Sequence, residues 1–519
     1  MDNSLLNYVS RFIVPFYFDY GNEAYEKVFN SFRDDIAYDE SLRLPKGRWI
    51  CAGFWENYKS KKNSSDAKNA EMDIFSYLPD IFKADENAGP VDSTNLGASF
   101  VYDTDGKLFN ACYYGRGNNE NQQEISFECK DIGVLLFKNG IGFLWYEVSF
   151  NGDLQEKEYI EFLHDFKELA RTQSKKFAVK MGYDQENKKS IYEPFCLGVW
   201  ISKVLRANEL GIHFWAARET TIDSNKLVIP DKALLFQYIF AQSFNEQERN
   251  DCIFQITNGY DTKYNAPEDL KNTLFCPFGN VCFYITNAGM GCVVTNDASN
   301  EAFFTGQFRE KFVRDYFFIY LLLLYQSYSC AYYSRQLTLL PADESAFRYE
   351  SGNIERIETL ISSINLFLVK SIFDSVSNVD HQNGVFRYGK KRLCIDGDIK
   401  GITAGLEGFG AIERAKKNLD ERMVREREEK EKEKQDGKVN RAITVFGFLV
   451  VISAILDGLN LVDWFRTNEL DLLHILVVIL ILVFTLYLIL EMLLQNIRKT
   501  GKKRAKDINC QKKGKRYER

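Results

Sequence analysis

The sequence predicts an α+β cytoplasmic head, followed by a long helical stalk and two C-terminal transmembrane helices. Three features of the 519-residue chain lead to this class. Residues 1–310 mix strand-like and helix-like segments, residues 311–440 are largely helix-like and become densely charged, and two apolar runs follow. A hydrophobic content of 45% and a charged content of 27% are typical of a chain with a folded core.

Residues 1–310 form the expected head. Asn139 and Gly140 between two apolar runs predict a tight hairpin turn within 134–148. Apolar residues at three-residue spacing predict one face of a helix over 156–171. Further apolar and aromatic runs predict strands at 49–55, 98–102, 108–114 and 282–286.

Residues 311–440 form the expected stalk region. The apolar run within 312–333 is too short for a membrane span, so we expect it to be a buried helix. Over 354–379 apolar residues recur in steps of three and four, which is typical of a helix that packs against other helices. We expect a break at 380–398 and then a second helix, starting near Ile412, that becomes fully charged.

The motifs predict no catalytic residues and leave the identity of any bound metal open. The sequence lacks a Gly-x-Ser-x-Gly motif, a Walker phosphate loop and an HExxH zinc motif. The eleven cysteines are scattered singly, without zinc-type spacing, and are expected to be reduced thiols. We therefore expect a protein that is not an enzyme.

Two apolar runs near the C-terminus predict a transmembrane hairpin. Ten Lys or Arg precede the first run in 413–440 and eleven follow the second in 496–519, whereas the connection holds only Arg466. This distribution places both termini in the cytoplasm and the chain in the cell membrane. The expected parts are a first transmembrane helix at 441–461, an external loop at 462–471, a second transmembrane helix at 472–494 and a basic tail at 495–519.

The charge distribution indicates which classes of partner the chain is expected to bind. The net charge is −6, but 496–519 holds eleven basic and two acidic residues, which leaves about −15 for the rest of the chain. An acidic body does not suit non-specific binding of nucleic acid, so no direct nucleic-acid partner is expected. A basic tail beside a span suits anionic membrane lipid.

Polar residues in the first apolar run predict an ion path. Ser453, Asp457 and Asn460 fall at i, i+4 and i+7, on one face of a helix. Polar groups within a span usually face a bundle interior or water, where a ring of carboxylates favours cations. Alternatively, Asp457 and Asn460 lie in the outer interface and only end the helix.

The tripeptide Gly458-Leu459-Asn460 stands at the outer end of this run. Together with the charged stalk before it and the acidic loop, second span and Lys-rich end after it, it resembles the CorA family of metal-ion transporters and channels, whose signature there is Gly-Met-Asn. The resemblance covers roughly residues 400–519. It implies a CorA-like funnel in the bacterial inner membrane, a homopentamer with Gly458 and Asn460 at the pore, and a divalent cation such as Mg²⁺.

A basic segment before the charged helix is the candidate ligand site. Cations interleaved with aromatic rings suit a phosphate and a stacked base. The alternative is a solvated basic turn between helices. The candidate residues within 386–392 are Arg387, Tyr388, Lys390, Lys391 and Arg392.

The expected function is an ion channel whose large cytoplasmic head gates the pore. CorA-like proteins encoded with type III CRISPR systems are similar in plan. That similarity implies a membrane effector of antiviral defence, activated by an adenine-type nucleotide second messenger. The alternatives are a constitutive Mg²⁺ transporter, or a membrane-anchored binding or enzymatic module whose hairpin does not conduct.

Overall fold

A computed structural model gives the fold of the chain. By its contacts the chain divides into two units, Met1–Gly410 and Ala411–Arg519. The structure describes residues 7–33, 48–51, 96–103, 109–114, 124–152, 154–170, 177–184, 189–194, 196–222, 225–241, 244–295, 300–339 and 351–458, together with Ile479, Val483 and Leu486.

The described residues form strands and helices in an irregular order. The strands are β1 (Asn7–Tyr17), β2 (Arg48–Cys51), β3 (Gly97–Asp103), β4 (Phe109–Tyr114), β5 (Glu124–Phe137), β6 (Ile141–Phe150), β7 (Phe177–Asp184), β8 (Lys189–Pro194), β9 (His213–Phe214), β10 (Ala217–Ile222), β11 (Asn225–Pro230), β12 (Leu234–Ala241), β13 (Phe275–Phe278), β14 (Val281–Thr286) and β15 (Gly289–Thr295). The helices are α1 (Asn22–Arg33), α4 (Glu156–Phe166), α5 (Leu197–Val204), α6 (Ala207–Leu210), α7 (Glu246–Asn258), η3 (Leu270–Asn272), η4 (Phe303–Phe308), α8 (Arg309–Lys311), η5 (Phe312–Tyr316), α9 (Phe317–Thr338), α10 (Ser351–Lys370), α11 (Asp380–Arg392) and α12 (Ile395–Gly458).

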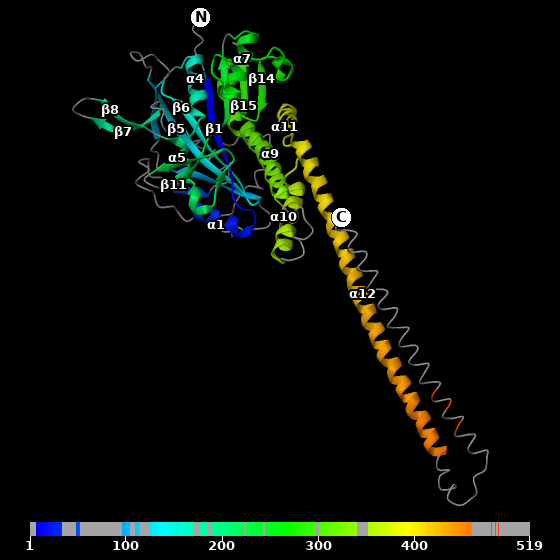
Figure 1. The fold of residues 1–519 in the computed structure, drawn as a ribbon. Coiled ribbons are helices and arrows are strands. Elements are labelled where there is room, and N and C mark those ends of the chain that lie inside the picture. The colour runs from blue at the N-terminus through cyan, green and yellow to red at the C-terminus, as the bar shows by residue number, and fades with distance from the viewer. Residues whose placement is uncertain are drawn as a thin grey trace, which may run out of the picture. The chain divides into compact units, whose positions relative to one another are not determined.

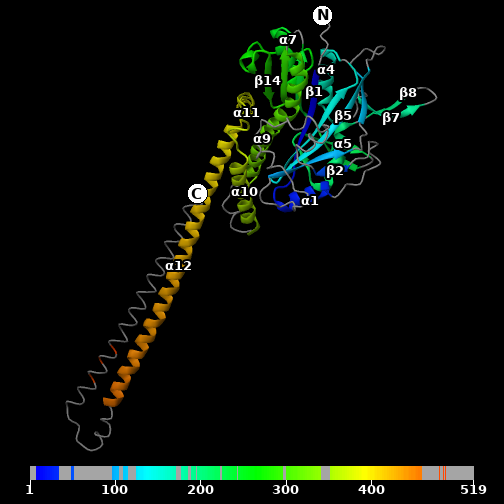
Figure 2. The same cartoon turned by 180° about the vertical axis from the view of Figure 1, so that it is seen from behind.

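Within the described residues, a 13-stranded sheet organises the first unit. Its main path runs β13-β14-β15-β12-β1-β6-β5-β4-β7-β8, while β2 pairs with β3, β3 with β5 and β9 with β1. Its strand pairs are antiparallel except β12 with β15, which are parallel. Figures 1 and 2 show the β7–β8 hairpin at one end of this path and β14 towards the other.

Strand β1 lies in the middle of the sheet and is buried over most of its length. Phe12 and Val14 belong to one apolar core, whereas Val9 and Ile13 belong to a second core. This alternation follows from the two-residue period of a strand, which sends successive side chains to opposite faces. A strand that is apolar on both sides needs a covering layer on each face.

Two sets of helices supply these layers. The first core contains side chains of α1, α4, α5 and α7, and the second contains side chains of η4, η5, α9, α10 and α11. Helix α9 is apolar around most of its circumference and buries Phe317, Leu321 and Leu324 among others. Figure 1 shows α9 beside the sheet, close to α10 and α11. The predicted buried helix within 312–333 is therefore confirmed.

Local signals located several elements correctly. The predicted hairpin is confirmed, because β5 and β6 are joined through a turn in which Gly140 has φ 88°. Helix α4 confirms the predicted helix, and β3, β4 and β14 confirm three of the predicted strands. Strand β2 confirms the start of the fourth, and residues 52–55 lie outside the described part of the chain.

The expected stalk needs two corrections. The break expected at 380–398 is wrong, because α11 occupies most of it and α12 begins at Ile395, well before Ile412. Helices α9, α10 and α11 also pack into the second core of the α/β unit. The expected fold class was wrong: the observed class is α/β, built on a large mixed sheet.

The expected transmembrane hairpin, and the membrane location and channel assignment that depended on it, are corrected too. None of the helices that the structure describes is both long and apolar enough to cross a bilayer. The structure describes α12 as far as Gly458, so the last residues of the expected first span, 459–461, lie outside the described part of the chain. The expected loop and nearly all of the expected second span lie outside the described residues.

One buried ion pair joins the two central strands. Arg11 of β1 lies opposite Glu147 of β6, and its Nε donates to a Glu147 carboxylate oxygen at 2.9 Å. The two side chains are 1% and 8% exposed. The guanidinium also donates to the carbonyl of Val313 at 2.6 Å and lies 4.5 Å from the centre of the Phe317 ring. The pair therefore ties the sheet to the covering layer of η5 and α9.

We predict that Arg11→Met lowers the free energy of unfolding by about 3–5 kcal/mol, because Glu147 would lose its closest cation in a buried site. Denaturant unfolding of the full chain measures the change. Lys130→Met is the matched control: this ammonium is 31% exposed and 3.6 Å from Glu147, so its loss should cost about 0–1 kcal/mol. Equal effects of the two substitutions would contradict the assignment.

Candidate functional site

The predicted ligand-binding residues all lie on or at the end of α11. This helix begins after Val379, whose backbone is extended, and its first turn carries Asp380. Two glycines bring it close to its neighbours: a Cβ on Gly384 would lie 2.4 Å from the Phe275 ring, and one on Gly389 would lie 2.3 Å from Leu323. Glycine at these two positions therefore allows the helix to pack closely against its neighbours.

Three of the five predicted residues hold α11 against the unit. The Tyr388 hydroxyl donates to the Thr273 carbonyl at 2.8 Å. Arg392 Nε donates to the Ile285 carbonyl at 3.1 Å, and its guanidinium lies 5.4 Å from the centre of the Tyr284 ring. Lys390 is 8% exposed, and its ammonium lies 2.9 Å from a carboxylate oxygen of Asp396.

The remaining two residues, Arg387 and Lys391, are exposed and lie one turn apart on α11. The structure thus does not bring the five residues together as one cationic pocket. Burial raises the pKa of the Tyr388 phenol to about 12, against the lowering effect of the nearby Arg392 charge. Tyr388 therefore acts as a neutral hydrogen-bond donor in this site.

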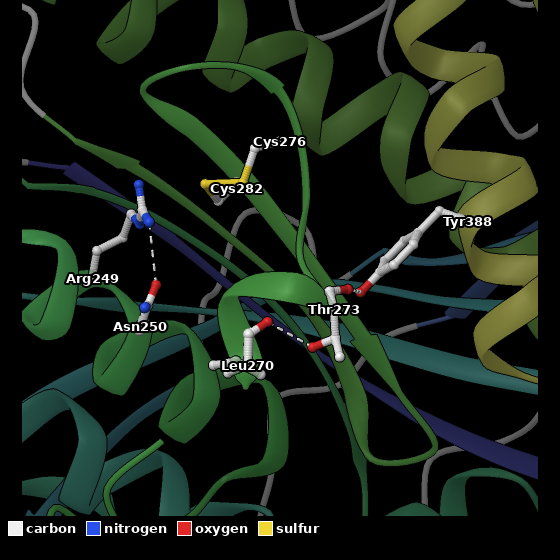
Figure 3. Close-up of a disulfide and its surroundings, with 7 residues drawn as sticks. All are labelled: Arg249, Asn250, Leu270, Thr273, Cys276, Cys282 and Tyr388. Carbon is white, nitrogen blue, oxygen red and sulfur yellow. Dashed lines mark hydrogen bonds between the residues drawn. A yellow bond between two sulfur atoms is a disulfide. The ribbon is translucent and has the colours of Figure 1, made fainter. Parts of the chain in front are cut away.

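A disulfide lies beside α11 in the same part of the fold (Figure 3). It joins Cys276 of β13 to Cys282 of β14, so the expectation of reduced thiols is wrong for this pair. Cys276 is exposed, whereas Cys282 is fully buried. Thiol–disulfide exchange needs access of a thiolate to one sulfur, and Cys276 is the exposed end of this bond. Cys292 of the neighbouring strand β15 is a free thiol.

The segment from η3 to β13 is held at both ends. Thr273 caps η3, with its hydroxyl donating to the Leu270 carbonyl at 2.7 Å, and its own carbonyl accepts from Tyr388. Figure 3 shows Tyr388 reaching Thr273 on one side and the disulfide on the other. The Phe275 ring stacks on Tyr388 with centroids 5.8 Å apart. We call Leu270–Phe278, with its disulfide to β14, the α11 platform, because α11 packs on it.

A polar network fixes the start of α11. Tyr316 of η5 and His381 lie 2.8 Å apart, hydroxyl oxygen to Nδ1, and the His381 ring meets the edge of Phe278. Ser377 donates to the Gln382 side chain at 2.6 Å. Among the described side chains, no group of three or more potential ligands converges in a way that could hold a metal ion.

The predicted pore residues fall at the end of the described chain. Ser453, Asp457 and Gly458 lie in the last turns of α12, where the structure describes the backbone only. Asn460 lies outside the described residues. The predicted ion path therefore remains without structural description.

Sequence reasoning missed the disulfide and the platform. The signal was present in Cys276-Pro-Phe-Gly-Asn-Val-Cys282, where two cysteines flank a Gly-Asn turn between short apolar runs. Cysteines placed opposite each other across such a turn come within bonding distance. Counting the cysteines as scattered single residues hid this pattern.

Comparison of the chain with protein-family models, with curated proteins and with solved structures finds no match. The resemblance to the CorA family stays a prediction.

We predict that Tyr388→Phe lowers the free energy of unfolding by about 0.5–1.5 kcal/mol near neutral pH, because the Thr273 carbonyl loses its donor. The raised phenol pKa means that the folded chain keeps this proton longer than the unfolded chain, so ionisation above pH 10 favours unfolding. The wild-type advantage over Tyr388→Phe should therefore shrink from pH 9 to 11. Denaturant unfolding at each pH measures it, and a constant or growing advantage would contradict the assignment.

Proposed function

We propose that this chain is a self-assembling protein, in which copies associate through α12. The observation that carries the proposal is an exposed apolar stripe on α12. Val439, Ile443, Phe446 and Val450 follow one another in steps of four, three and four, and are 55%, 62%, 71% and 57% exposed. That spacing places them on one face of a helix, the face that a partner helix covers in a coiled coil.

The length of α12 supports the same role. It has 64 residues, which corresponds to roughly 96 Å at 1.5 Å per residue. All residues from 421 to 444 are exposed, so no other described part of the chain covers this segment. Pairs such as Glu421 with Arg425, at 3.8 Å, add only about 0.3–0.5 kcal/mol each. Helices in proteins take most of their stability from packing, which here requires a partner.

A second apolar stripe belongs to the same unit. Ile479, Val483 and Leu486 are helical, are spaced by four and three residues, and are 55%, 63% and 67% exposed. Covering the seven side chains of both stripes would stabilise an assembly by roughly 10–20 kcal/mol per copy. This stabilisation exceeds most of the range of ~4–15 kcal/mol that association costs in lost translational and rotational freedom.

The charges of α12 favour a second copy of this chain as the partner. Residues 421–441 contain seven acidic and eight basic side chains, closely interleaved. Identical helices can therefore lie side by side with opposite charges facing each other and almost no net repulsion. The copy number of five, which rested on the CorA resemblance, stays a prediction.

We predict that Ile443→Asp combined with Phe446→Asp weakens association at least about 100-fold, equal to about 2.7 kcal/mol, because two carboxylates would be buried at the contact. Sedimentation velocity of the full chain measures the mass against concentration. Thr444→Asp is the matched control, since it adds a carboxylate on α12 about 120° away from the stripe. A wild-type chain that stays monomeric, or a double variant that assembles like the wild type, would contradict the proposal.

A further inference from the structure

We propose that the Cys276–Cys282 disulfide is a redox switch that controls how firmly α11 is held on its platform. The proposal does not depend on self-assembly of α12. It rests on the exposure of Cys276, the position of β13 in the sheet and the contacts between β13 and α11.

Access to the bond is one-sided. Cys276 is exposed, whereas Cys282 is buried at 0% exposure in the first core. Cys276 is therefore the end of the bond that a small thiol approaches from solvent, whereas Cys282 is covered by the core.

The exchange takes two steps. A thiolate attacks the Cys276 sulfur, a mixed disulfide forms there, the Cys276–Cys282 bond breaks, and Cys282 leaves and takes up a proton. A second thiol then attacks the outer sulfur of the mixed disulfide, which releases Cys276 as a thiol. Two external thiols are oxidised to one disulfide, and the two cysteines gain two electrons and two protons. The co-reactant is a small-molecule thiol or dithiol.

Strand β13 depends on this bond more than other strands do. It stands at the end of the main strand path, where it pairs with β14 alone. Its ladder is irregular between the pairs Phe275–Phe283 and Phe278–Val281. Strand β13 has four residues and pairs on one side, through an interrupted ladder. Few backbone hydrogen bonds therefore hold it in the sheet. The disulfide is the covalent tie that keeps it on β14.

The first half of α11 rests on β13. Phe275 lies under Gly384 and stacks on Tyr388, and Phe278 meets His381. The second half rests elsewhere, because Gly389 packs on α9 and β14, and Arg392 bonds to the Ile285 carbonyl of β14. Reduction should therefore loosen β13 and the first half of α11, while the end that continues into α12 stays attached.

Hydrogen exchange of the full chain, with and without dithiothreitol, tests the switch. We expect exchange at least about fivefold faster in residues 270–278 and 380–388 after reduction, with β1 and β6 unchanged. Cys276→Ser should show the faster exchange without reductant and no further response to it. Cys394→Ser, which removes a nearby exposed thiol, should behave like the wild type.

Two results would overturn the proposal. Intact mass after thiol labelling could show that dithiothreitol exposes no additional pair of thiols, which would mean that the bond is absent or not accessible. Alternatively, reduction of the wild-type chain could leave exchange in 270–278 and 380–388 unchanged. If Cys276→Ser does not fold, the response of the wild-type chain to reductant decides alone.

Discussion

Apolar side chains on both faces of the central strands set the main constraint on this structure. Strands β1 and β6 alternate between two cores, so a layer of helices must cover each face. One layer comes from α1, α4, α5 and α7, and the other from η5, α9, α10 and α11. The Arg11–Glu147 pair shows how closely the second layer fits, since Arg11 bonds both to its partner strand and to the Val313 carbonyl of η5. The α11 platform exists because the second layer extends over β13 and β14.

Helix α12 meets the same constraint in a different way. Its apolar stripe at Val439, Ile443, Phe446 and Val450 is exposed and is not covered by the part of the chain that the structure describes. We have proposed that other copies provide that cover, and that the mixed charges before the stripe suit such an arrangement. The proposed redox switch lies near the start of α12 instead. There α11 leads into α12 through Cys394, whose φ is 56°.

Local patterns predicted local structure well. Asn139-Gly140 predicted a hairpin because a tight turn depends on two residues, and continuous apolarity over 312–333 predicted a buried helix because burial follows composition. Functions of side chains that depend on the fold were not predictable in this way. The sequence predicted a ligand site that includes Tyr388, Lys390 and Arg392. In the fold, these side chains form hydrogen bonds and an ion pair with groups that only folding brings near them. The sequence at the apolar end of α12 fits both a membrane span and a contact between helices. Both need apolar side chains on the surface of a long helix.

Photo-crosslinking from position 446 tests the central claim about α12 most directly. A benzophenone amino acid in place of Phe446 in the full chain should form covalent dimers and larger species, with the adducts mapping to α12 of another copy. The same probe in place of Thr444, on another face of the helix, should give far less product. Crosslinks confined to a single chain, or equal yields from the two positions, would contradict the account.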